Sequence, residues 1–397
     1  MSWKVKSWND VLEIRSGRNQ KDVINPEGIY PIIGSAGKVM GYADDYLCEA
    51  GTTIIGRKGT INNPLFIEEN FWNVDTAFGL QCKEGLNKYF FHYFCLSFDF
   101  TEMDKGSGRP SLVKSDLLKI PIPIPPLSEQ KQIVALLDQA FVSIDKAKAN
   151  IEQNIQNAKE LFQSKLNEVF SQSGDGWEEK KLIEVNKFID YRGKTPKKTE
   201  SGIKLITAKN VRMGYMRNKP EEFIAEADYD EWMTRGIPKK GDVLFTTEAP
   251  LANVTLLNTS EKIALAQRII TLCPDRSILS GEYLTYCLQS KIIQNKILEK
   301  GTGATVTGIK SRLLKEITIP IPPLTKQDSD VTSLDKFKTQ SNTLIKKYNH
   351  KLSSLEELKK SILQKAFAGE LVSAAQATEL KQKVVNMAAE PEVEYKK

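Results

Sequence analysis

Residues 120–127 read Ile-Pro-Ile-Pro-Ile-Pro-Pro-Leu, and residues 317–324 read Ile-Thr-Ile-Pro-Ile-Pro-Pro-Leu. The alternating isoleucines give each segment one apolar face. The prolines remove backbone N–H donors, so each segment is expected at a sheet edge or in an extended run. Each copy is therefore predicted to close a globular domain, and a chain that closes two domains in the same way is predicted to be an internal repeat.

The repeat continues beyond these two segments. With the same offset and no gap, the matched pairs that follow include Gln130/Gln327, Leu137/Leu334, Asp138/Asp335, Glu160/Glu357 and Phe170/Phe367. Weaker similarity relates residues 3–11 to residues 177–185, whereas residues 15–105 and 190–300 share almost nothing. A duplicated frame with divergent contents implies two similar scaffolds that read two different targets.

Long segments without proline or glycine follow both copies, and each begins next to a hydroxyl residue, Ser128 or Thr325, that is predicted to cap a helix. Apolar residues occupy nine of eleven heptad core positions between Val134 and Val169, and eight of eleven between Val331 and Ala366. A 3.5-residue repeat sustained over this length is typical of a coiled coil. Both segments are therefore predicted to be long helices.

Helices of roughly 40 residues are about 60 Å long, and we expect these two to bury their apolar seams against each other as an antiparallel pair. The alternative is that each pairs with a helix of another protein, which would leave its seam exposed in the isolated chain. The predicted organisation is globular domains at 1–127 and 174–324, helices at 128–173 and 325–372, and a tail at 373–397. The tail fits either a frayed helix or a docking segment.

Composition restricts the chemistry. Hydrophobic residues make up 40% of the 397 positions and charged residues 27%, as in a folded protein. The chain has neither a run of 18 apolar residues nor a signal-peptide core, so we expect a cytoplasmic protein without membrane contact. Five cysteines without a C-x-x-C pair fit a reducing compartment. Only His92 and His350 are available for zinc binding or imidazole catalysis.

No motif for catalysis or metal binding stands out. Residues 303–311 are similar to a phosphate-binding loop, but the inserted Ile309 would turn the following lysine away from a phosphate. Residues 63–66 are similar to the Asn-Pro-Pro-Phe loop of amino-methyltransferases, but one proline is missing and no glycine-rich loop for a methyl donor precedes them. Pairing Asp242 with Glu248 as metal ligands does not rise above chance among 50 acidic residues. We therefore predict no catalytic residue and no metal site.

Nucleic-acid binding is the chemistry that the charge pattern favours. The net charge is +6, and residues 191–219 hold nine Lys or Arg against one acid. Glycine-bracketed loops that present cations occur in both divergent regions, and Lys, Arg and Asn are side chains that contact phosphates and base edges. Each loop alone also fits a solvated turn, but paired placement in two copies favours DNA. The candidate DNA-binding residues are Lys38, Tyr42, Arg57, Lys58, Thr60, Ser107, Arg109, Tyr191, Arg192, Lys194, Lys197, Lys209, Asn210, Arg212, Thr302 and Thr305.

Two divergent globular units, each closed by the same Ile-Pro-rich segment and followed by a long helix, resemble the specificity subunit of type I restriction-modification systems. The most specific similarities are residues 120–130, residues 317–327 and the Lys-Gly-Asp-Val-Leu motif at 240–244, which is altered at 50–54. The resemblance implies an α/β chain with two target recognition domains of mixed α+β structure, at 1–127 and 174–324. Two long antiparallel coiled-coil helices would separate them, with a pseudo-twofold internal repeat.

The resemblance also implies a function. Each target recognition domain would read one half of a bipartite target in double-stranded DNA, while the helices set the spacer and dock two methyltransferase subunits, to which restriction subunits bind. The chain would be non-catalytic, and S-adenosylmethionine, ATP and Mg²⁺ would belong to the partner subunits, with no cofactor on this chain. Two alternatives remain: a coiled-coil scaffold that does not read DNA, and a stand-alone DNA methyltransferase.

Overall fold

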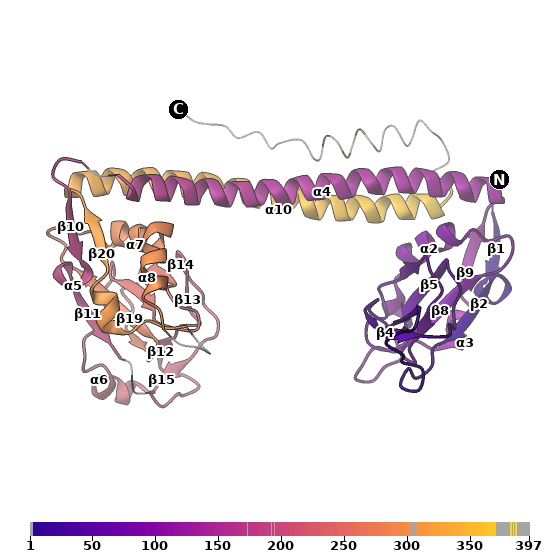
Figure 1. Ribbon diagram of the computed structural model, residues 1–397, viewed down its shortest axis with the longest axis horizontal. Coiled ribbons are helices and arrows are strands. Elements are labelled where there is room, and N and C mark those ends of the chain that lie inside the picture. The colour runs from indigo at the N-terminus through magenta and orange to yellow at the C-terminus, as the bar shows by residue number, and fades with distance from the viewer. Residues whose placement is uncertain are drawn as a thin grey trace. The chain divides into compact units, whose positions relative to one another are not determined.

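The computed structural model describes residues 3–172, 174–191, 193, 195–302, 307–370, 382, 384 and 386. The chain divides into two compact units, of which unit 1 comprises residues 1–154 and 347–397 and unit 2 comprises residues 155–346. Helices α4 (Leu127–Phe170) and α10 (Leu324–Phe367) have 44 residues each, and each contributes to both units (Figure 1). No helix in the described part of the chain has the length and apolarity needed to cross a membrane.

Unit 1 contains a four-stranded antiparallel sheet in the order β2-β8-β5-β6 and a three-stranded sheet in the order β4-β3-β7, in which β3 and β7 are parallel. A separate antiparallel pair joins β1 to β9. The elements that precede α4 are β1 (Lys4–Ser7), α1 (Trp8–Val11), β2 (Leu12–Ser16), β3 (Tyr30–Ile33), β4 (Val39–Ala43), β5 (Thr52–Gly56), β6 (Leu65–Ile67), β7 (Trp72–Asn73), β8 (Ala77–Cys82), α2 (Lys88–Ser97), the 3₁₀ helix η1 (Phe100–Met103), α3 (Lys114–Leu117) and β9 (Pro121–Ile124).

Unit 2 repeats this design with β11-β19-β16-β17 as the four-stranded sheet and β15-β12-β18 as the three-stranded sheet. A short hairpin, β13-β14, has no counterpart among the described residues of unit 1. The elements that precede α10 are β10 (Glu178–Lys181), α5 (Leu182–Val185), β11 (Asn186–Asp190), β12 (Ile203–Ile206), β13 (Val211–Arg212), β14 (Tyr215–Met216), β15 (Phe223–Ile224), the 3₁₀ helix η2 (Glu226–Asp228), α6 (Tyr229–Trp232), β16 (Val243–Thr246), β17 (Val254–Leu256), β18 (Ile263–Leu265), β19 (Ile269–Pro274), α7 (Gly281–Gln289), α8 (Lys291–Glu299), α9 (Ser311–Lys315) and β20 (Thr318–Ile321).

The internal repeat therefore extends into the divergent stretches, where the sequence shows no similarity. Strands β3 and β7 pair in parallel in unit 1, and β12 and β18 do the same in unit 2. The central strands β5 and β16 are buried along their whole length. A buried strand requires apolar or β-branched residues but no particular sequence, so the same topology forms from unrelated segments.

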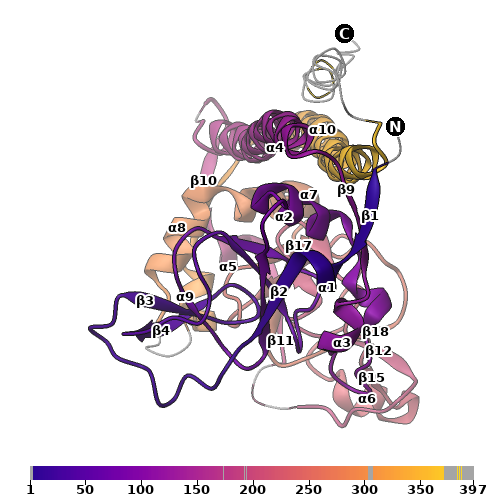
Figure 2. The same cartoon turned by 90° about the vertical axis from the view of Figure 1, so that its right-hand side faces the viewer.

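The Ile-Pro-rich segments form strands β9 and β20, each in a two-stranded antiparallel ladder, which confirms their prediction as edge structure. Ile122 and Ile319 are fully buried. The prolines cost no central ladder bond, because each of these strands pairs with a single strand in the described part of the chain. In Figures 1 and 2 the β1-β9 ladder rises from the globular part of unit 1 to the start of α4.

The helix starts differ from the prediction. Helix α4 begins at Leu127 and α10 at Leu324, so Ser128 and Thr325 are second residues of their helices and the prediction of an N-cap is wrong. The carbonyl of the preceding proline begins each helix instead. The Pro126 carbonyl accepts the N–H of Gln130 at 3.0 Å, and a proline at a helix start leaves no N–H of its own unpaired.

The antiparallel pairing of the helices is confirmed within each unit. In unit 1 the ammonium of Lys148 forms an ion pair with Glu356, and that of Lys359 lies 3.7 Å from the carboxylate of Asp145. Residue numbers on α10 thus rise as those on α4 fall. In unit 2 the Ser341 hydroxyl donates to the carbonyl of Ala158 at 3.0 Å. The predicted seam residues Leu137, Ile144, Ile151, Leu334, Leu355 and Ile362 are almost completely buried.

Candidate nucleic-acid interface

Two predicted DNA-contacting loops of unit 1 lie side by side. Residues 57–60, which we call loop 1, follow strand β5, and residues 106–111 return next to them. The Gly59 N–H donates to the Pro110 carbonyl at 2.8 Å, and the Leu112 N–H donates to the Arg57 carbonyl at 2.9 Å. A Cβ at Gly59 would lie 2.9 Å from the Arg109 guanidinium. Arg57, Lys58, Thr60 and Arg109 are therefore brought together, and Ser107 is exposed in the same segment as Arg109.

Thr76 joins loop 1 to the turn between β3 and β4. Its carbonyl accepts the N–H of Arg57 at 2.8 Å and that of Lys58 at 3.2 Å. The same residue lines a surface hollow together with Lys38 and Met40. Lys38 thus borders the same surface as loop 1, and Tyr42 is exposed on strand β4. Arg57 is half-buried, and it donates through Nη1 to the carbonyl of Asp75 at 3.3 Å.

Unit 2 contains an equivalent of loop 1 that the sequence analysis missed. Residues 247–250, which we call loop 2, follow strand β16 as loop 1 follows β5. The Ile309 N–H donates to the Thr247 carbonyl at 3.0 Å, which reproduces the contact of Leu112 with Arg57. The Thr247 N–H donates to the Arg268 carbonyl at 3.1 Å, as Arg57 does to Thr76. Arg268 of unit 2 therefore stands where unit 1 has Thr76.

The two loops share an unusual backbone conformation. Gly59 in loop 1 has a φ of 83°, and Ala249 in loop 2 has a φ of 49°. A left-handed conformation costs an L-residue such as alanine roughly 1–2 kcal/mol. Ala249 is therefore strained, and strained backbone concentrates at functional sites, whereas Gly59 adopts the same left-handed conformation without strain. A left-handed residue at the same place in both units marks the two loops as candidate reading elements.

Charged side chains surround loop 2. The Nε of Arg268 lies 2.9 Å from a carboxylate oxygen of Glu248, and both side chains are about half exposed. A hollow of about 190 Å³ beside this ion pair is lined by Lys198, Lys209 and Gln267, among others. Gln267, Arg268 and Glu248 are candidate DNA-contacting residues that the search for glycine-bracketed loops could not find. Counting onward from the Lys-Gly-Asp-Val-Leu motif and its altered copy would have found loop 2.

Two predicted DNA-binding residues are corrected because they are core residues. Tyr191 is 3% exposed, its hydroxyl donates to the Gly236 carbonyl at 2.9 Å, and its ring stacks on Trp232. Asn210 is 1% exposed, and its amide donates to the carbonyls of Arg217 and Pro220. Both side chains stabilise the fold of unit 2 and cannot reach DNA without unfolding it.

The remaining predicted residues of unit 2 vary in placement. Lys197, Lys209 and Thr302 are exposed. Arg212 is half-buried, and its guanidinium donates to the carbonyls of Ala208 and Val211. The other three candidates lie outside the described residues: Arg192, Lys194 and Thr305.

The carboxylate, thiol and imidazole side chains that catalysis or metal binding would require have structural roles in the described part of the chain. Asp242 is 4% exposed, accepts the Lys239 N–H at 2.7 Å and lies 3.5 Å from the Arg276 guanidinium. Burial, and next the charge of Asp242, raises the pKa of the Cys273 thiol to about 12. Burial lowers the pKa of His92 to about 4. The described residues contain no cluster of three potential metal ligands.

Comparison with known proteins finds one matching family model and relatives that cover most of the chain. The family model described as "Type I restriction modification DNA specificity domain" matches residues 1–157 and 174–354. The specificity subunit of the MjaVIII type I restriction enzyme from Methanocaldococcus jannaschii is 24% identical, with 93% of each chain covered. That of EcoR124I/EcoR124II from Escherichia coli is 27% identical over 78% of this chain and 80% of the relative.

Solved structures show the same fold. A chain from a structure on the assembly and conformational transition of the type I R-M system has a TM-score of 0.74 at 21% identity, covering 93% of this chain and 98% of that one. The HsdS subunit from Thermoanaerobacter tengcongensis has a TM-score of 0.54 at 20% identity, covering 93% and 97%. The fold class predicted from the repeat is thereby confirmed.

Proposed function

This chain belongs to the family of type I restriction-modification DNA specificity domains, and from that premise we propose how its two units divide the reading of DNA. As a specificity subunit it is the DNA-recognition component of a type I restriction enzyme and not its catalytic one. Unit 1 reads one half of a bipartite duplex target through loop 1 and its neighbours, and unit 2 reads the other half through loop 2.

One observation carries this division: the two units hold loops on the same backbone contacts but with different side chains. Loop 1 presents Arg57 and Lys58, and loop 2 presents Glu248 with Arg268 beside it. Arginine and lysine donate to the acceptors of guanine, whereas a glutamate accepts from the amino group of cytosine. The same frame is therefore equipped to read two different base sequences, and neither a scaffold nor a stand-alone methyltransferase requires this arrangement.

The helices supply the second element of the proposal. We infer that α4 and α10 set the length of DNA between the half-sites, which should lie about one helical turn of DNA apart, on the order of 35 Å. Two methyltransferase subunits dock on this chain, one for each half-site, and restriction subunits bind to them. These partners bind S-adenosylmethionine, ATP and Mg²⁺ and flip the target base into their own pockets, while this chain holds the duplex.

Replacing one cation at each reading loop should weaken DNA binding by the assembled complex. We expect Arg57→Ala and Arg268→Ala each to cost about 1–3 kcal/mol when the side chain reads a base, and to lower the salt slope by about one when it contacts a phosphate. Fluorescence anisotropy at several salt concentrations separates these cases. Lys119→Ala removes an exposed charge that belongs to neither reading loop and is the matched control. Unchanged binding by both arginine variants would contradict the assignment of the loops.

Lengthening both helices together should lengthen the spacer. Seven residues inserted after Asn154 and after Lys346 preserve the heptad register and add about 10 Å of helix, which corresponds to at most about three base pairs of DNA. Methylation mapping should show a longer spacer with both half-sites unchanged. Insertion into α4 alone mispairs the seam and serves as the control. An unchanged spacer in the double insertion would show that the helices do not set it.

A further inference from the structure

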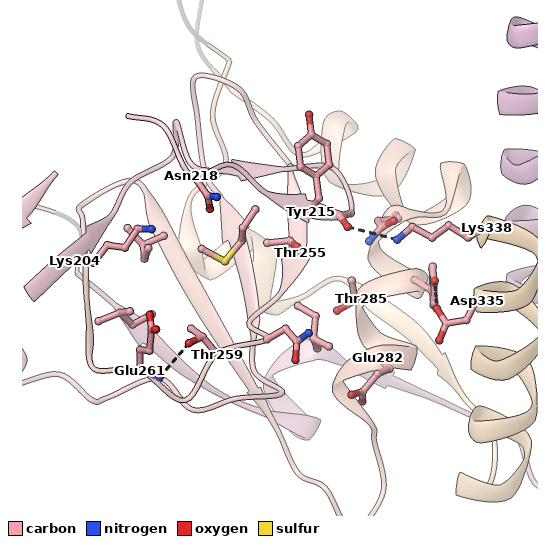
Figure 3. A pocket seen from close by; sticks show the side chains of 18 residues that line it. Lys204, Tyr215, Asn218, Thr255, Thr259, Glu261, Glu282, Thr285, Asp335 and Lys338 are labelled. Carbon is pink, nitrogen blue, oxygen red and sulfur yellow. Dashed lines mark hydrogen bonds between the residues drawn. The ribbon is translucent and has the colours of Figure 1, made fainter. Parts of the chain in front are cut away.

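One set of polar contacts occurs twice, where each globular part meets a long helix. In unit 1 the hydroxyl of Tyr93 on α2 donates to the carboxylate of Asp138 on α4. In unit 2 the hydroxyl of Tyr286 on α7 donates to the carboxylate of Asp335 on α10. Figure 3 shows Asp335 and Lys338 projecting from α10 toward a cavity of about 500 Å³ in unit 2.

A glutamine completes each contact set. Gln130 is fully buried, accepts the N–H of Asn87 at 2.7 Å and donates to the carbonyls of Gly85 and Pro125 at 3.1 and 2.9 Å. These partners lie at the start of α2 and before α4, so the amide joins the globular part to the helix. We call Tyr93, Gln130 and Asp138 junction 1.

Unit 2 repeats each of these bonds. Gln327 is fully buried, accepts the N–H of Ser280 at 2.9 Å and donates to the carbonyls of Ile278 and Pro322 at 2.7 and 2.8 Å. Asn87 and Ser280 are the N-cap residues of α2 and α7. We call Tyr286, Gln327 and Asp335 junction 2.

The ring of each tyrosine also contacts a side chain of the long helix. The ring of Tyr93 meets that of Phe141 on α4 edge to face, at 5.4 Å between centroids. The ammonium of Lys338 on α10 lies 5.4 Å from the ring centre of Tyr286. Burial, and then the hydrogen bond to aspartate, raises the pKa of both tyrosines well above the ordinary value.

The covalent link between a globular part and its helix is short but would not by itself fix an angle. Strand β9 ends at Ile124 and α4 begins at Leu127, and rotation about the few bonds between them would swing the globular part. A directional hydrogen bond about three helical turns into α4, at Asp138, opposes that swing because it acts at a distance from the link. The same argument applies to Asp335 on α10.

We propose that junctions 1 and 2 fix the angle of each globular part on its helix and thereby determine how strictly the enzyme selects the spacer length of its target. This inference rests on the proposed function. The junction residues are positioning residues that hold the reading loops at a defined angle and do not themselves touch DNA. A loosened junction lets a unit tilt toward half-sites that are one base pair too near or too far.

The test uses the full-length chain assembled with the methyltransferase subunits of its own system. Methylation mapping first defines the target. Initial rates of methyl transfer are then measured on duplexes with the native spacer and with one base pair removed or added. Tyr93→Phe and Tyr286→Phe delete one oxygen atom and keep the ring packing. Tyr89→Phe, on the same helix α2, deletes a hydroxyl outside the junction and is the matched control.

We expect Tyr93→Phe and Tyr286→Phe each to lower the ratio of native-spacer to shifted-spacer rates about three- to ten-fold, the range that corresponds to the loss of one hydrogen bond. Asp138→Asn and Asp335→Asn retain an acceptor oxygen and should keep most of the ratio. Tyr89→Phe should leave the ratio unchanged. The melting temperature of each variant, measured in parallel, reports any loss of folded protein, which would lower all rates together and leave the ratio as it is.

The proposal is overturned if both tyrosine variants keep the wild-type ratio, whatever their melting temperature or absolute rate. A reduced rate that is equal for all spacers would likewise show a purely structural role. The proposed function fails in a different way, because the wild-type complex would then methylate no bipartite target at all.

Discussion

Exchange of residues 15–105 for the corresponding segment of another family member should change the bases recognised in one half of the target and leave the other half unchanged. Each mismatched base pair costs about 1–3 kcal/mol, so a half-site that differs at several positions should lose methylation by orders of magnitude. The exchange should fold because Gln130 binds only main-chain groups of this segment. Tyr93 is the junction side chain inside the segment that the donor must also supply.

Methylation mapping of the exchanged protein, assembled with its partner subunits, gives the outcome directly. The reciprocal exchange of residues 190–300 is the matched control, since it should change the other half-site alone. A new sequence in both halves, or in neither, would contradict the division of reading between units 1 and 2.

Gln130→Ala should lower the stability of the chain more than any substitution on the reading surface. The change leaves the Asn87 N–H and the carbonyls of Gly85 and Pro125 without the partner that they have in this fold. An unsatisfied buried polar group costs about 1–3 kcal/mol, and some of these groups will recover a partner by relaxation. We therefore expect a loss of about 2–4 kcal/mol, measured by chemical denaturation monitored by circular dichroism.

The neighbouring glutamine provides the control. Gln132 is exposed on the same turn of α4, so Gln132→Ala removes the same amide from water and should change stability by no more than about 0.5 kcal/mol. Gln327→Ala should behave like Gln130→Ala because its bonds are the same. Equal and small effects for all three variants would mean that the buried amides do not hold the globular parts to the helices.

Features that depend on local pattern were predictable from the sequence. The alternation of isoleucine and proline predicted an edge strand, and the heptads predicted helices whose seam residues, such as Ile144 and Leu355, are buried. Matched residues such as Gln130 and Gln327 indicated a duplicated frame. Their role as junction residues was not visible, because the groups that they bind in the globular parts lie more than 40 positions away along the chain.

The reading surface was predictable only in part. Loop 1 was predicted because Gly56 and Gly59 bracket its cations, but loop 2 carries Ala249 at the position of Gly59 and so lacks the glycine signal. Tyr191 was mistaken for a surface residue because its partners, Trp232 and Gly236, are distant in sequence. Charge and glycine content report exposure only statistically, whereas burial is decided by the tertiary packing of sheets whose sequences do not repeat.

Unit 1 is assembled from residues 1–154 and 347–397, with the 192 residues of unit 2 between them. During translation, at about 5–20 residues per second, the first half of α4 leaves the ribosome about 10–40 seconds before the part of α10 that covers it. The part of its apolar face that α10 covers is exposed throughout that interval. Synthesis of this chain therefore includes a stage at which the first half of α4 has been made and the part of α10 that covers it has not. A chaperone or an early-binding subunit would bind the exposed apolar face of α4 at that stage.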